Sequence, residues 1–511
     1  MSNNDSASTA TPQMFGHPKG LFYLFFAELW ERFSFYGMRA LLTLYMVNKL
    51  FEAFADRDTR SIIIYASYGS LVYASTVLGG RVSDALLGNR KSIILGGVMM
   101  SIGHFVLAID NQATFFAGLA LIIIGTGYFK SNISTFVGTL YEKNDPRQDG
   151  GFTIFYMGIN IGAFTAPLLC AWLASSYGWH YGFGAAGVGM VLGLVTFVYG
   201  SRSGVFGDKG YPLQPEKLEK KWAGLKVGVW VPLLSFAAVP VITLMISDYT
   251  VYTIGSIFEG SIVRLFFYVL LIVIIGYLVW VSVKLPREEW QKLVVAVFLT
   301  MFMSFFWGFH ELSGSIITLF AARNVNLVGM DAAGTNSLNP FFIVVFSMVM
   351  PVVWMWLSKK GKNPRTPYKF AMGLAQLGVG FFIISLSKSF ADDNGFVPFI
   401  FLVVMYLFIS TGELFMSPVG LSKITSLSPL KIKSFMMGVW FMSSAFAFQI
   451  GGMVGEYLAI ESNQAADQVG GWDTLDVYLN GFEKIAYVSF GFALLVVVLS
   501  PWLKKWMKEV H

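Results

Sequence analysis

Long apolar runs, separated by short polar stretches, recur from residue 20 to residue 503 of this 511-residue chain. Each run has about 20 residues or more, the length that an α-helix needs to cross the hydrocarbon core of a bilayer. The pattern predicts membrane spans near residues 20–50, 61–87, 92–109, 113–140, 151–176, 180–200, 224–247, 262–284, 289–322, 338–358, 367–388, 396–426, 433–459 and 481–503. We therefore expect an all-α polytopic membrane protein with fourteen spans.

The composition excludes an ordinary soluble domain, because 55% of the residues are hydrophobic and only 13% are charged. A net charge of +6 would suggest an acidic partner in a soluble protein. Here about two thirds of the 36 Lys and Arg residues lie in alternate loops, together with the region near each terminus. The positive-inside rule places these loops and both termini in the cytoplasm. The charge is thus a topological signal, and we expect no nucleic-acid partner.

One hydrophilic segment divides the chain. Residues 201–223 follow the sixth span and contain Gly, Pro and Lys. We expect an N-terminal six-helix bundle (1–200), a cytoplasmic linker (201–223), a two-helix insertion (224–285) and a C-terminal six-helix bundle (286–511). The insertion has few polar residues in its spans, so we expect it to pack outside the core. The remaining twelve spans fit the major facilitator fold, in which two halves each contain two three-helix repeats.

The first span, Phe22 to Met46, is apolar enough to cross a bilayer and yet carries charges. At 100° per residue, Glu28, Arg32, Tyr36 and Arg39 fall within about 80° of one another. A charge that faces lipid costs at least about 2.5 to 3.5 kcal/mol, so this face must line protein or water. The other ionisable residues near mid-span lie on the first helices of the remaining repeats: Lys130, His310, Glu311 and Glu413. A central cavity between the halves is therefore predicted.

Two motifs carry a resemblance to a known family. ELWERFSFYGMR, from Glu28 to Arg39, and GFTIFYMGINIGAF, from Gly151 to Phe164, resemble signatures of the proton-dependent oligopeptide transporter (POT) family of the major facilitator superfamily. Further residues match this family: Tyr73, Lys130, Trp307, Glu311, Asn339, Pro340, Glu413 and Trp440. The likeness extends over nearly the whole chain, including the two extra helices of bacterial members.

The resemblance implies a proton-coupled symporter that imports di- and tripeptides across a bacterial inner membrane by alternating access. It implies no enzyme activity, no metal and no cofactor other than protons. We expect a monomer that contacts membrane lipid. The sequence departs from the family pattern at Thr76 and Ser131, where proline is usual, at Arg81, which replaces an apolar residue, and at Leu312, which follows Glu311 in place of glutamine. These departures concern gating and side-chain selectivity and leave the class unchanged.

A short peptide is a zwitterion whose charged ends are at most about 3.5 Å per residue apart. The resemblance implies that Arg39 and Lys130 bind its carboxylate and Glu413 its ammonium group. Asn160 and Asn339 can each donate and accept for the peptide unit, although Asn160 could instead join two helices. The predicted side-chain pocket consists of Tyr36, Tyr73, Tyr156, Trp307 and Trp440, for which helix packing is the alternative.

Proton coupling is assigned, on the resemblance, to Glu28, Glu31, Arg32, Lys130 and Glu311. Burial disfavours the charged form of a carboxylate and a nearby cation favours it, so protonation of one partner frees the other. We expect an ion pair between Arg39 and Glu311 to gate the outer side. The resemblance gives His310 no role, and we interpret it as a helix-packing residue, with a proton carrier as the alternative.

Other classes remain as alternatives. A transporter of a small anion such as nitrate would need the cations and not Glu413. A membrane enzyme would need a nucleophile with a base or a metal cluster, which five scattered His and one Cys do not supply. A channel is more often built from fewer helices per chain around a symmetric pore. A sensor would need an output domain, and the sequence has no long soluble segment.

Overall fold

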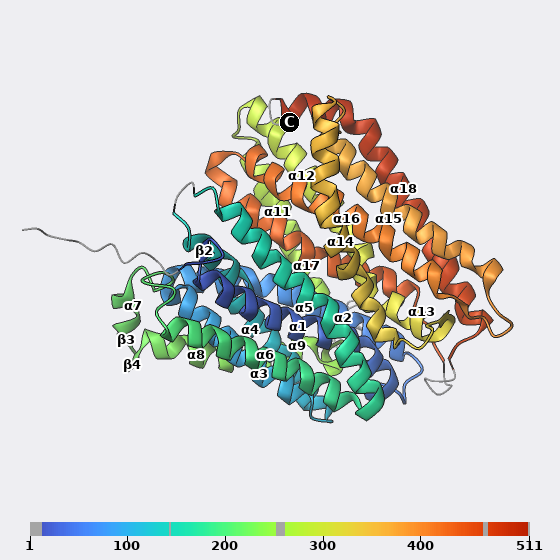
Figure 1. Cartoon of the computed structure of the whole chain (residues 1–511), viewed down its shortest axis with the longest axis horizontal. Helices are drawn as coiled ribbons and strands as arrows, with labels where there is room; N and C mark the ends of the chain where they lie inside the picture. The colour runs from blue at the N-terminus through green and yellow to red at the C-terminus, as the bar shows by residue number, and fades with distance from the viewer. Residues whose placement is uncertain (1–12, 143–144, 252–260, 463–468, 509–511) are drawn as a thin grey trace, which may run out of the picture.

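The computed structural model describes residues 13–142, 145–251, 261–462 and 469–508, and these are mostly helical (Figure 1). The first half contains α1 (Gly20–Tyr45), η1 (Met46–Leu50), α2 (Arg57–Val82), η2 (Ser83–Leu87), α3 (Gly88–Leu107), α4 (Gln112–Thr139), α5 (Gln148–Tyr177) and α6 (Trp179–Arg202). The next segment contains α7 (Pro215–Glu219), α8 (Val227–Ala237), α9 (Val239–Ile246) and α11 (Ile262–Ser282).

The second half contains α12 (Arg287–His310), η4 (Glu311–Gly314), α13 (Ile316–Asn324), η5 (Ala332–Ser337), α14 (Leu338–Lys359), α15 (Thr366–Ser385), η6 (Leu386–Phe390), α16 (Phe399–Leu427), η7 (Leu430–Ile432), α17 (Lys433–Tyr457) and α18 (Trp472–Met507). Three two-residue strand pairs join loops: β1 (Gln13–Met14) with β2 (His17–Pro18), β3 (Lys221–Trp222) with β4 (Leu225–Lys226), and β5 (Val325–Asn326) with β6 (Val397–Pro398).

The number of spans agrees with the prediction. Among the described residues, 12 helical stretches are long and apolar enough to cross a membrane. One of these stretches, from Arg57 to Leu107, contains two spans, α2 and α3. The helix α1 is a further span, although its charges make it less apolar than the others. The described residues therefore contain fourteen spans. The protein is therefore an all-α, multi-pass membrane protein.

Two predicted spans are not single helices. The span expected at 289–322 ends as α12 at His310, makes the 3-10 turn η4 and resumes as α13. The span expected at 224–247 divides into α8 and α9, where Pro240 stands in the first turn of α9. Proline has no amide N–H to continue the helical hydrogen bonds, which explains this second break.

The two halves meet at one end and diverge toward the other. Figure 1 shows α1 to α6 as one group of helices and α12 to α18 as another, and the groups spread toward the end where the C-terminus lies. The contacts between the groups join α2 to α17, α5 to α14 and η5, and α1 to η4 and α13. We call the end formed by α13, η5 and the start of α18 the closed end.

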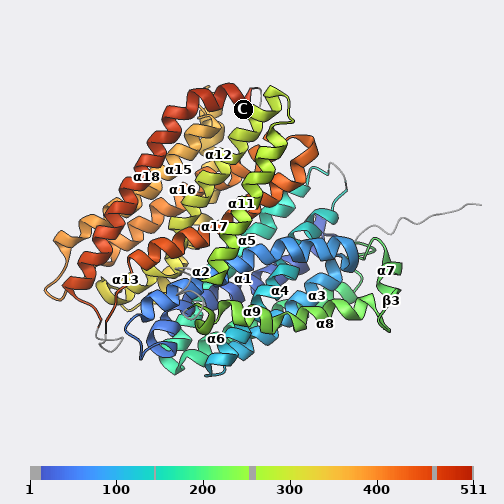
Figure 2. The same ribbon diagram turned by 180° about the vertical axis from the view of Figure 1, so that it is seen from behind.

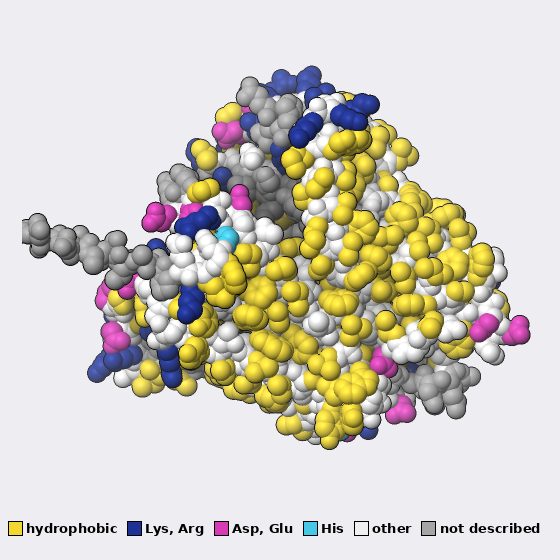
Figure 3. Space-filling model, viewed as in Figure 1, with side chains coloured by type: hydrophobic (Ala, Val, Ile, Leu, Met, Phe, Trp, Pro, Cys, Tyr) yellow, Lys and Arg dark blue, Asp and Glu magenta, His cyan; other side chains and the backbone are white. Residues whose placement is uncertain are grey.

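The two-helix insertion lies on one side of the bundle. Figure 2 shows α8, α9 and α11 on the face that it presents, and α9 packs on α4 and α2 while α11 packs on α2 and α17. Only 17% of the apolar window of α8 and α9 is buried, compared with 72% for α4, as expected for helices that face lipid. The opposite face of the molecule, in the view of Figure 1, also has a broad hydrophobic surface with charged side chains near its edges (Figure 3).

Ion pairs tie this insertion to both halves. Arg60 Nη1 of α2 lies 2.8 Å from Oδ1 of Asp248, which follows α9. Arg264 of α11 is paired with Glu456 of α17. Arg264 lies in the first turn of α11, and its buried side chain joins the insertion to the second half.

The linker after α6 folds back onto the first half. Arg90, near the start of α3, is buried and donates from Nε to the carbonyl oxygen of Lys209 at 2.7 Å. Its Nη1 donates to the hydroxyl of Tyr211 at 3.0 Å. A loop that the sequence presents as a hydrophilic junction is thus anchored to the N-terminal bundle.

Small residues bring neighbouring helices together. Glycines on α3 and α4 face each other so closely that a Cβ on Gly96 would lie 2.5 Å from the carbonyl oxygen of Gly125. On α2, a Cβ on Gly79 would lie 2.1 Å from the carbonyl oxygen of Gly127 on α4. Such close approach of backbones is the usual way in which helices pack in a bilayer, where lipid competes for apolar contacts.

This packing predicts different outcomes for two adjacent glycines. Gly79→Ala should force α2 and α4 apart and cost about 1 to 3 kcal/mol, because the obstructing atoms belong to the backbone. Gly80→Ala is the matched control, since its Cβ would lie 3.4 Å from Ser131 Oγ, an ordinary contact. Thermal melting of each purified variant, followed by tryptophan fluorescence, measures the difference. Equal melting temperatures for the two variants would contradict this account of the α2–α4 contact.

Candidate functional site

The charged face of α1 is buried and paired, as its helical spacing predicts. Glu28, Glu31 and Arg32 are all less than 4% exposed. Arg32 Nε lies 3.1 Å from Glu28 Oε1 and also pairs with Glu31. One guanidinium group therefore serves two carboxylates. Within the described residues, Glu28 Oε2 has no hydrogen-bond partner, so this carboxylate could accept a proton without breaking another contact.

Lys130 of α4 stands close to this group. Its ammonium nitrogen lies 3.9 Å from the centroid of the Tyr73 ring, a cation–π arrangement. Glu28 and Glu31 are near enough to interact electrostatically with it. Within the part of the chain that the structure describes, no carboxylate lies within ion-pair distance of Lys130. This cation is therefore available to an added anion.

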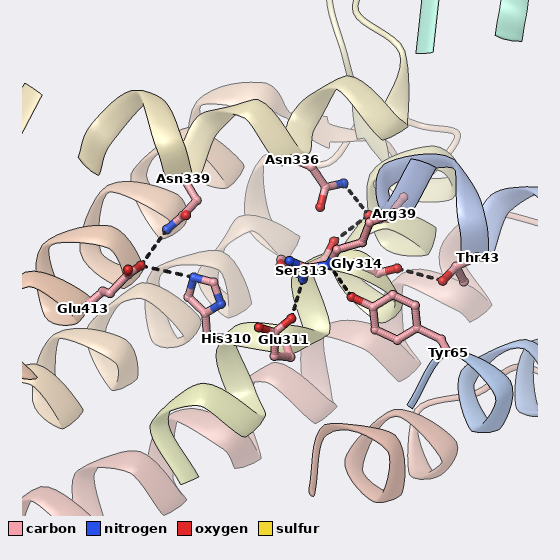
Figure 4. Close-up of polar contacts among 11 residues, drawn as sticks. Arg39, Thr43, Tyr65, His310, Glu311, Ser313, Gly314, Asn336, Asn339 and Glu413 are labelled. Carbon is pink, nitrogen blue, oxygen red and sulfur yellow. Dashed lines mark hydrogen bonds and ion pairs between the residues drawn. The ribbon is translucent and has the colours of Figure 1, made fainter. Parts of the chain in front are cut away.

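Arg39 connects α1 to the second half of the chain. It pairs with Glu311 at the start of η4, and its Nε donates to the hydroxyl of Tyr65 at 2.7 Å. Its Nη2 lies 3.3 Å from Ser313 Oγ (Figure 4). One turn further along α1, Thr43 Oγ1 donates to the carbonyl oxygen of Gly314 at 2.7 Å. The sequence predicted an ion pair here, and the structure brings its two residues together.

The break after α12 makes these contacts possible. A Cβ on Gly314 would lie 2.0 Å from the Tyr65 hydroxyl, so only glycine allows η4 to approach α2 this closely. The 3-10 turn directs Glu311 and Ser313 toward Arg39 and exposes a carbonyl oxygen to Thr43. A straight helix would continue its own hydrogen bonds there.

A second polar group surrounds Glu413 of α16. Glu413 Oε2 accepts from Asn339 Nδ2 of α14 at 3.3 Å, and Asn339 also lies 3.0 Å from Ser410 Oγ. His310 Nε2, at the last residue of α12, is 3.5 Å from the same Glu413 oxygen. Figure 4 shows Glu413 and Arg39 on opposite sides of the view, with His310 and Glu311 between them.

A cavity of about 150 Å³ joins these groups. It is smaller than the roughly 300 to 1,000 Å³ of pockets for drug-sized ligands, so it admits only a compact ligand in this conformation. Both halves of the chain line it, with the predicted residues Tyr36, Arg39, Tyr73, Tyr156, Asn160, Trp307, Glu311, Asn339 and Glu413 together with Ala40, Ile159, Ala163, His310, Ser313, Asn336, Pro340 and Ile343.

Some predicted residues lie outside this lining. Trp440 of α17 is 7% exposed, and its indole packs against Gly420 of α16. Lys130 stands behind Tyr73, and the Glu28, Glu31 and Arg32 group is near Lys130. Asn160 lines the cavity and donates to the carbonyl oxygen of Tyr156 in its own helix, at 2.9 Å. Within the described residues it makes no hydrogen bond to another helix.

Two contacts are not predicted from the sequence. His310, interpreted as a helix-packing residue, lines the cavity and lies beside Glu413. At the closed end, Asp58 of α2 and Arg323 of α13 form a bidentate ion pair with distances of 2.6 and 2.8 Å. Arg323 also donates to the hydroxyl of Tyr478 at 2.7 Å. The sequence signal for this pair was one charged residue beside a predicted span in each half, Asp58 before 61–87 and Arg323 after 289–322.

The comparisons with known proteins identify the family of the chain. The model of the POT family matches residues 90–469. The Bacillus subtilis protein described as uncharacterized transporter YclF is 34% identical over 99% of both chains. The peptide transporter YePEPT of Yersinia enterocolitica is 33% identical over 88% of this chain and 90% of its own. The dipeptide and tripeptide permease A of Escherichia coli is 30% identical over 99% of this chain and 97% of its own.

Solved structures give the same result. A crystal structure of a peptide transporter POT in complex with sulfate has a TM-score of 0.81, with 34% identity over 98% of both chains. A mutant peptide transporter POT in complex with alafosfalin has a TM-score of 0.80, with 33% identity over 98% of this chain and 97% of that one. The helices that can cross a membrane, together with the family match and these relatives, define a multi-pass membrane transporter and not an enzyme. The chain belongs to the POT family.

The closed-end ion pair generates a prediction. Asp58→Asn keeps the shape of the side chain but leaves the buried guanidinium of Arg323 without a counter-ion, which should cost about 3 to 5 kcal/mol. Lys388→Gln is the control, because the pair of Lys388 with Asp476 is 53% and 45% exposed and should contribute about 1 kcal/mol or less. Thermal melting compares the two. A decrease in melting temperature that is no larger for Asp58→Asn than for Lys388→Gln would contradict the predicted cost of leaving Arg323 unpaired.

Proposed function

We propose that this protein is a proton-coupled symporter that imports di- and tripeptides by alternating access. The POT family membership and the relatives described as dipeptide and tripeptide permeases support this function. The observation that carries it is the placement of Arg39 and Glu413 on the walls of one cavity. Arg39 belongs to the first half and Glu413 to the second, so a ligand that binds both joins the halves through its own charges.

A zwitterionic peptide fits this arrangement. Its carboxylate binds Arg39 in a bidentate arrangement and also binds Lys130. Its ammonium group binds Glu413. Asn160 and Asn339 line the cavity between the two halves and bind the peptide unit. The side chains of the peptide contact an aromatic surface that tolerates side chains of different shape, formed by Tyr36, Tyr73, Tyr156 and Trp307. Trp440 lies outside the cavity lining and packs against α16.

Proton coupling follows from competition for the cations. Arg39 is held by Glu311, so the peptide carboxylate gains this guanidinium when Glu311 becomes protonated. Lys130 is near Glu28 and Glu31, whose charges Arg32 already shares. Protonation of either carboxylate weakens its electrostatic attraction for Lys130. Protons are the coupling ion, and we infer no other cofactor.

Alternating access requires the halves to move against each other. We infer that residues 1–200 and 286–511 move as two bundles, connected by the linker 201–223 and accompanied by the insertion 224–285. The closed end faces the outside, and the other end, with both termini, faces the cytoplasm of a bacterial cell. The bias of Lys and Arg toward alternate loops supports this orientation. The protein functions as a monomer surrounded by lipid.

The driving force is sufficient. One proton that moves down a potential of 100 mV gains about 2.3 kcal/mol, and one pH unit adds about 1.4 kcal/mol. Together these support a gradient of several hundredfold for a solute without net charge. A small inorganic anion is the second candidate, because it could bind Arg39 and Lys130. An anion would leave Glu413 in the same cavity with no function, so the presence of this carboxylate favours a peptide as the substrate.

Uptake into proteoliposomes tests the proposed function. A labelled dipeptide such as Ala-Ala should accumulate when the interior is negative and the proton gradient is inward, and accumulation should stop when the two are dissipated. Unlabelled tripeptide should compete and free alanine should not. Absence of uptake by folded, correctly oriented protein would contradict peptide transport. Uptake that does not depend on either gradient would contradict proton coupling.

Glu311 provides a test of the coupling step. Glu311→Gln mimics the protonated carboxylate and leaves Arg39 permanently available, so peptide exchange should persist while proton-driven uptake falls by at least about tenfold. Glu289→Gln, at an exposed position in the first turn of α12, is the matched control and should alter neither rate. Both rates are measured in the same proteoliposomes. Equal loss of exchange and uptake would show that Glu311 is not the coupling carboxylate.

A further inference from the structure

A groove of about 530 Å³ lies between the insertion and the first half of the chain. Residues of α2, η2 and α4 form one wall, and residues of α8, α9 and α11 form the other. Among the described residues, none lines both this groove and the peptide cavity. Leu78 on one wall is 72% exposed and Leu234 on the other is 55% exposed, so the groove opens to the lipid around these helices.

The groove offers no polar atom to a ligand. Its described lining holds no charged side chain, and its three hydroxyl groups already have partners. The hydroxyls of Tyr128 and Ser235 lie 2.9 Å apart and join α4 to α8. Ser75 Oγ donates to the carbonyl oxygen of Ile123 at 2.8 Å. Water in a cavity needs about two to four polar partners, so hydrocarbon is the occupant that these walls favour.

The length of the groove suits an acyl chain. On α2 and η2 its lining extends from Leu71 to Leu86, which is about 22 Å at about 1.5 Å per residue. One leaflet contributes about 15 Å of hydrocarbon, which is half of the core of a bilayer. A lipid tail can therefore lie in the groove along its whole length.

Basic residues gather at one end of the groove. The short helix α7 contacts η2 there, and its Leu218 packs in one cluster with Leu87 and Val231. Lys226 pairs with Glu219. Within the described part of the chain, three exposed lysines of the same segment form no ion pair: Lys217, Lys220 and Lys221.

Two tryptophans mark this end as a membrane interface. The ring centroids of Trp222 and Trp230 lie 5.0 Å apart, and Trp230 Nε1 donates to the carbonyl oxygen of Trp222 at 2.7 Å. Figure 2 shows β3 and α7 together at the end of α8. Tryptophan is enriched where hydrocarbon meets the headgroups. In the proposed orientation this is the cytoplasmic interface, where anionic lipids give the membrane a negative surface potential.

We propose that the groove binds one anionic glycerophospholipid of the cytoplasmic leaflet. An acyl chain lies between α2, α4 and α8, and the headgroup phosphate lies at Lys217, Lys220 and Lys221. The apolar walls hold the chain, and the lysines select a lipid with net negative charge. The bound lipid joins the insertion to the first half. This inference relies on the orientation given with the proposed function, and it adds a ligand site outside the peptide path.

Native mass spectrometry of the full-length, delipidated protein in detergent tests the site. The probe is palmitoyl-oleoyl-phosphatidylglycerol, and phosphatidylcholine with the same chains is the neutral comparison. The Kd of the first bound lipid should be at least about tenfold lower for phosphatidylglycerol, because the lysines attract its charge. Glycerol 3-phosphate should not compete, since it has no acyl chain. Equal Kd values for the two lipids, or competition by glycerol 3-phosphate, would overturn the proposal.

The lysines are tested together. Lys217→Gln, Lys220→Gln and Lys221→Gln in one protein should bring the Kd values of the two lipids within about twofold of each other. The matched control carries Lys359→Gln, Lys360→Gln and Lys362→Gln, which remove the same charge at exposed positions at the end of α14. This control should keep the preference of the wild type. An equal loss of preference in both proteins would show that net charge, and not this site, selects the lipid.

The acyl chain is tested by filling the groove. Ala238→Phe places a ring in the lining and should weaken the binding of both lipids at least about fivefold. Val241→Phe is the control, because Val241 is 58% exposed and lies outside the lining. Leu234→Trp replaces the first variant if thermal melting shows that it does not fold. Unchanged lipid binding in the folded, filled variant would contradict the groove as the site.

Dipeptide uptake is measured separately from lipid binding. Failure of the lipid tests leaves the proposed function intact. Absence of uptake by a protein that still selects phosphatidylglycerol would contradict the proposed function alone.

Discussion

The structure depends on one constraint, which is that a charge in a low-dielectric membrane interior is costly unless a partner compensates it. Arg32 has Glu28 and Glu31, Arg39 has Glu311, Arg323 has Asp58, and Arg264 has Glu456. Three of these four groups join different helices, and two of them join the two halves of the chain. The two pairs that join the halves, Arg39 with Glu311 and Arg323 with Asp58, are therefore also contacts that must break when the halves separate at the closed end.

A transporter can use such pairs because each offers an exchange. A proton can replace a cation on a carboxylate, and a ligand carboxylate can replace a protein carboxylate on a cation. The cavity contains one group for each exchange. Arg39 is paired with Glu311, and Glu413 lies beside His310 and the amide of Asn339. A peptide supplies the complementary charges for both. Its binding would thus substitute for contacts within the protein and would keep the buried charges compensated through the cycle.

Much of this was predictable from the sequence. The length and hydropathy of the apolar runs gave the number of spans, and the spacing from Glu28 to Arg39 gave a buried charged face. The breaks at Glu311 and Ala238 were not predicted, since an apolar run has the same hydropathy in a straight and in a broken helix, although Pro240 marks the second break in the sequence. The motifs placed Arg39, Glu311 and Glu413 in one site, and the structure brings these three residues to one cavity.

Two other ion pairs between distant segments could not be predicted from the sequence. The pairing of Asp58 with Arg323 depends on how α2 and α13 meet at the closed end, and the pairing of Arg264 with Glu456 depends on where the insertion lies. His310 looked like a packing residue because its neighbour Glu413 is about 100 residues away in the chain. Lys130 and Trp440 were assigned to the peptide site, yet both lie behind the residues that line the cavity.

The central claim is that the two ends of a peptide are recognised by opposite charges on the two halves. Competition against labelled Ala-Ala by three ligands tests it directly: Ala-Ala, its N-acetyl derivative and its C-terminal amide. Each blocked ligand should compete at least about tenfold more weakly than Ala-Ala, because each leaves one buried charge unpaired. Equal competition by the N-acetyl derivative would contradict the claim, since Glu413 would then have no cation to bind.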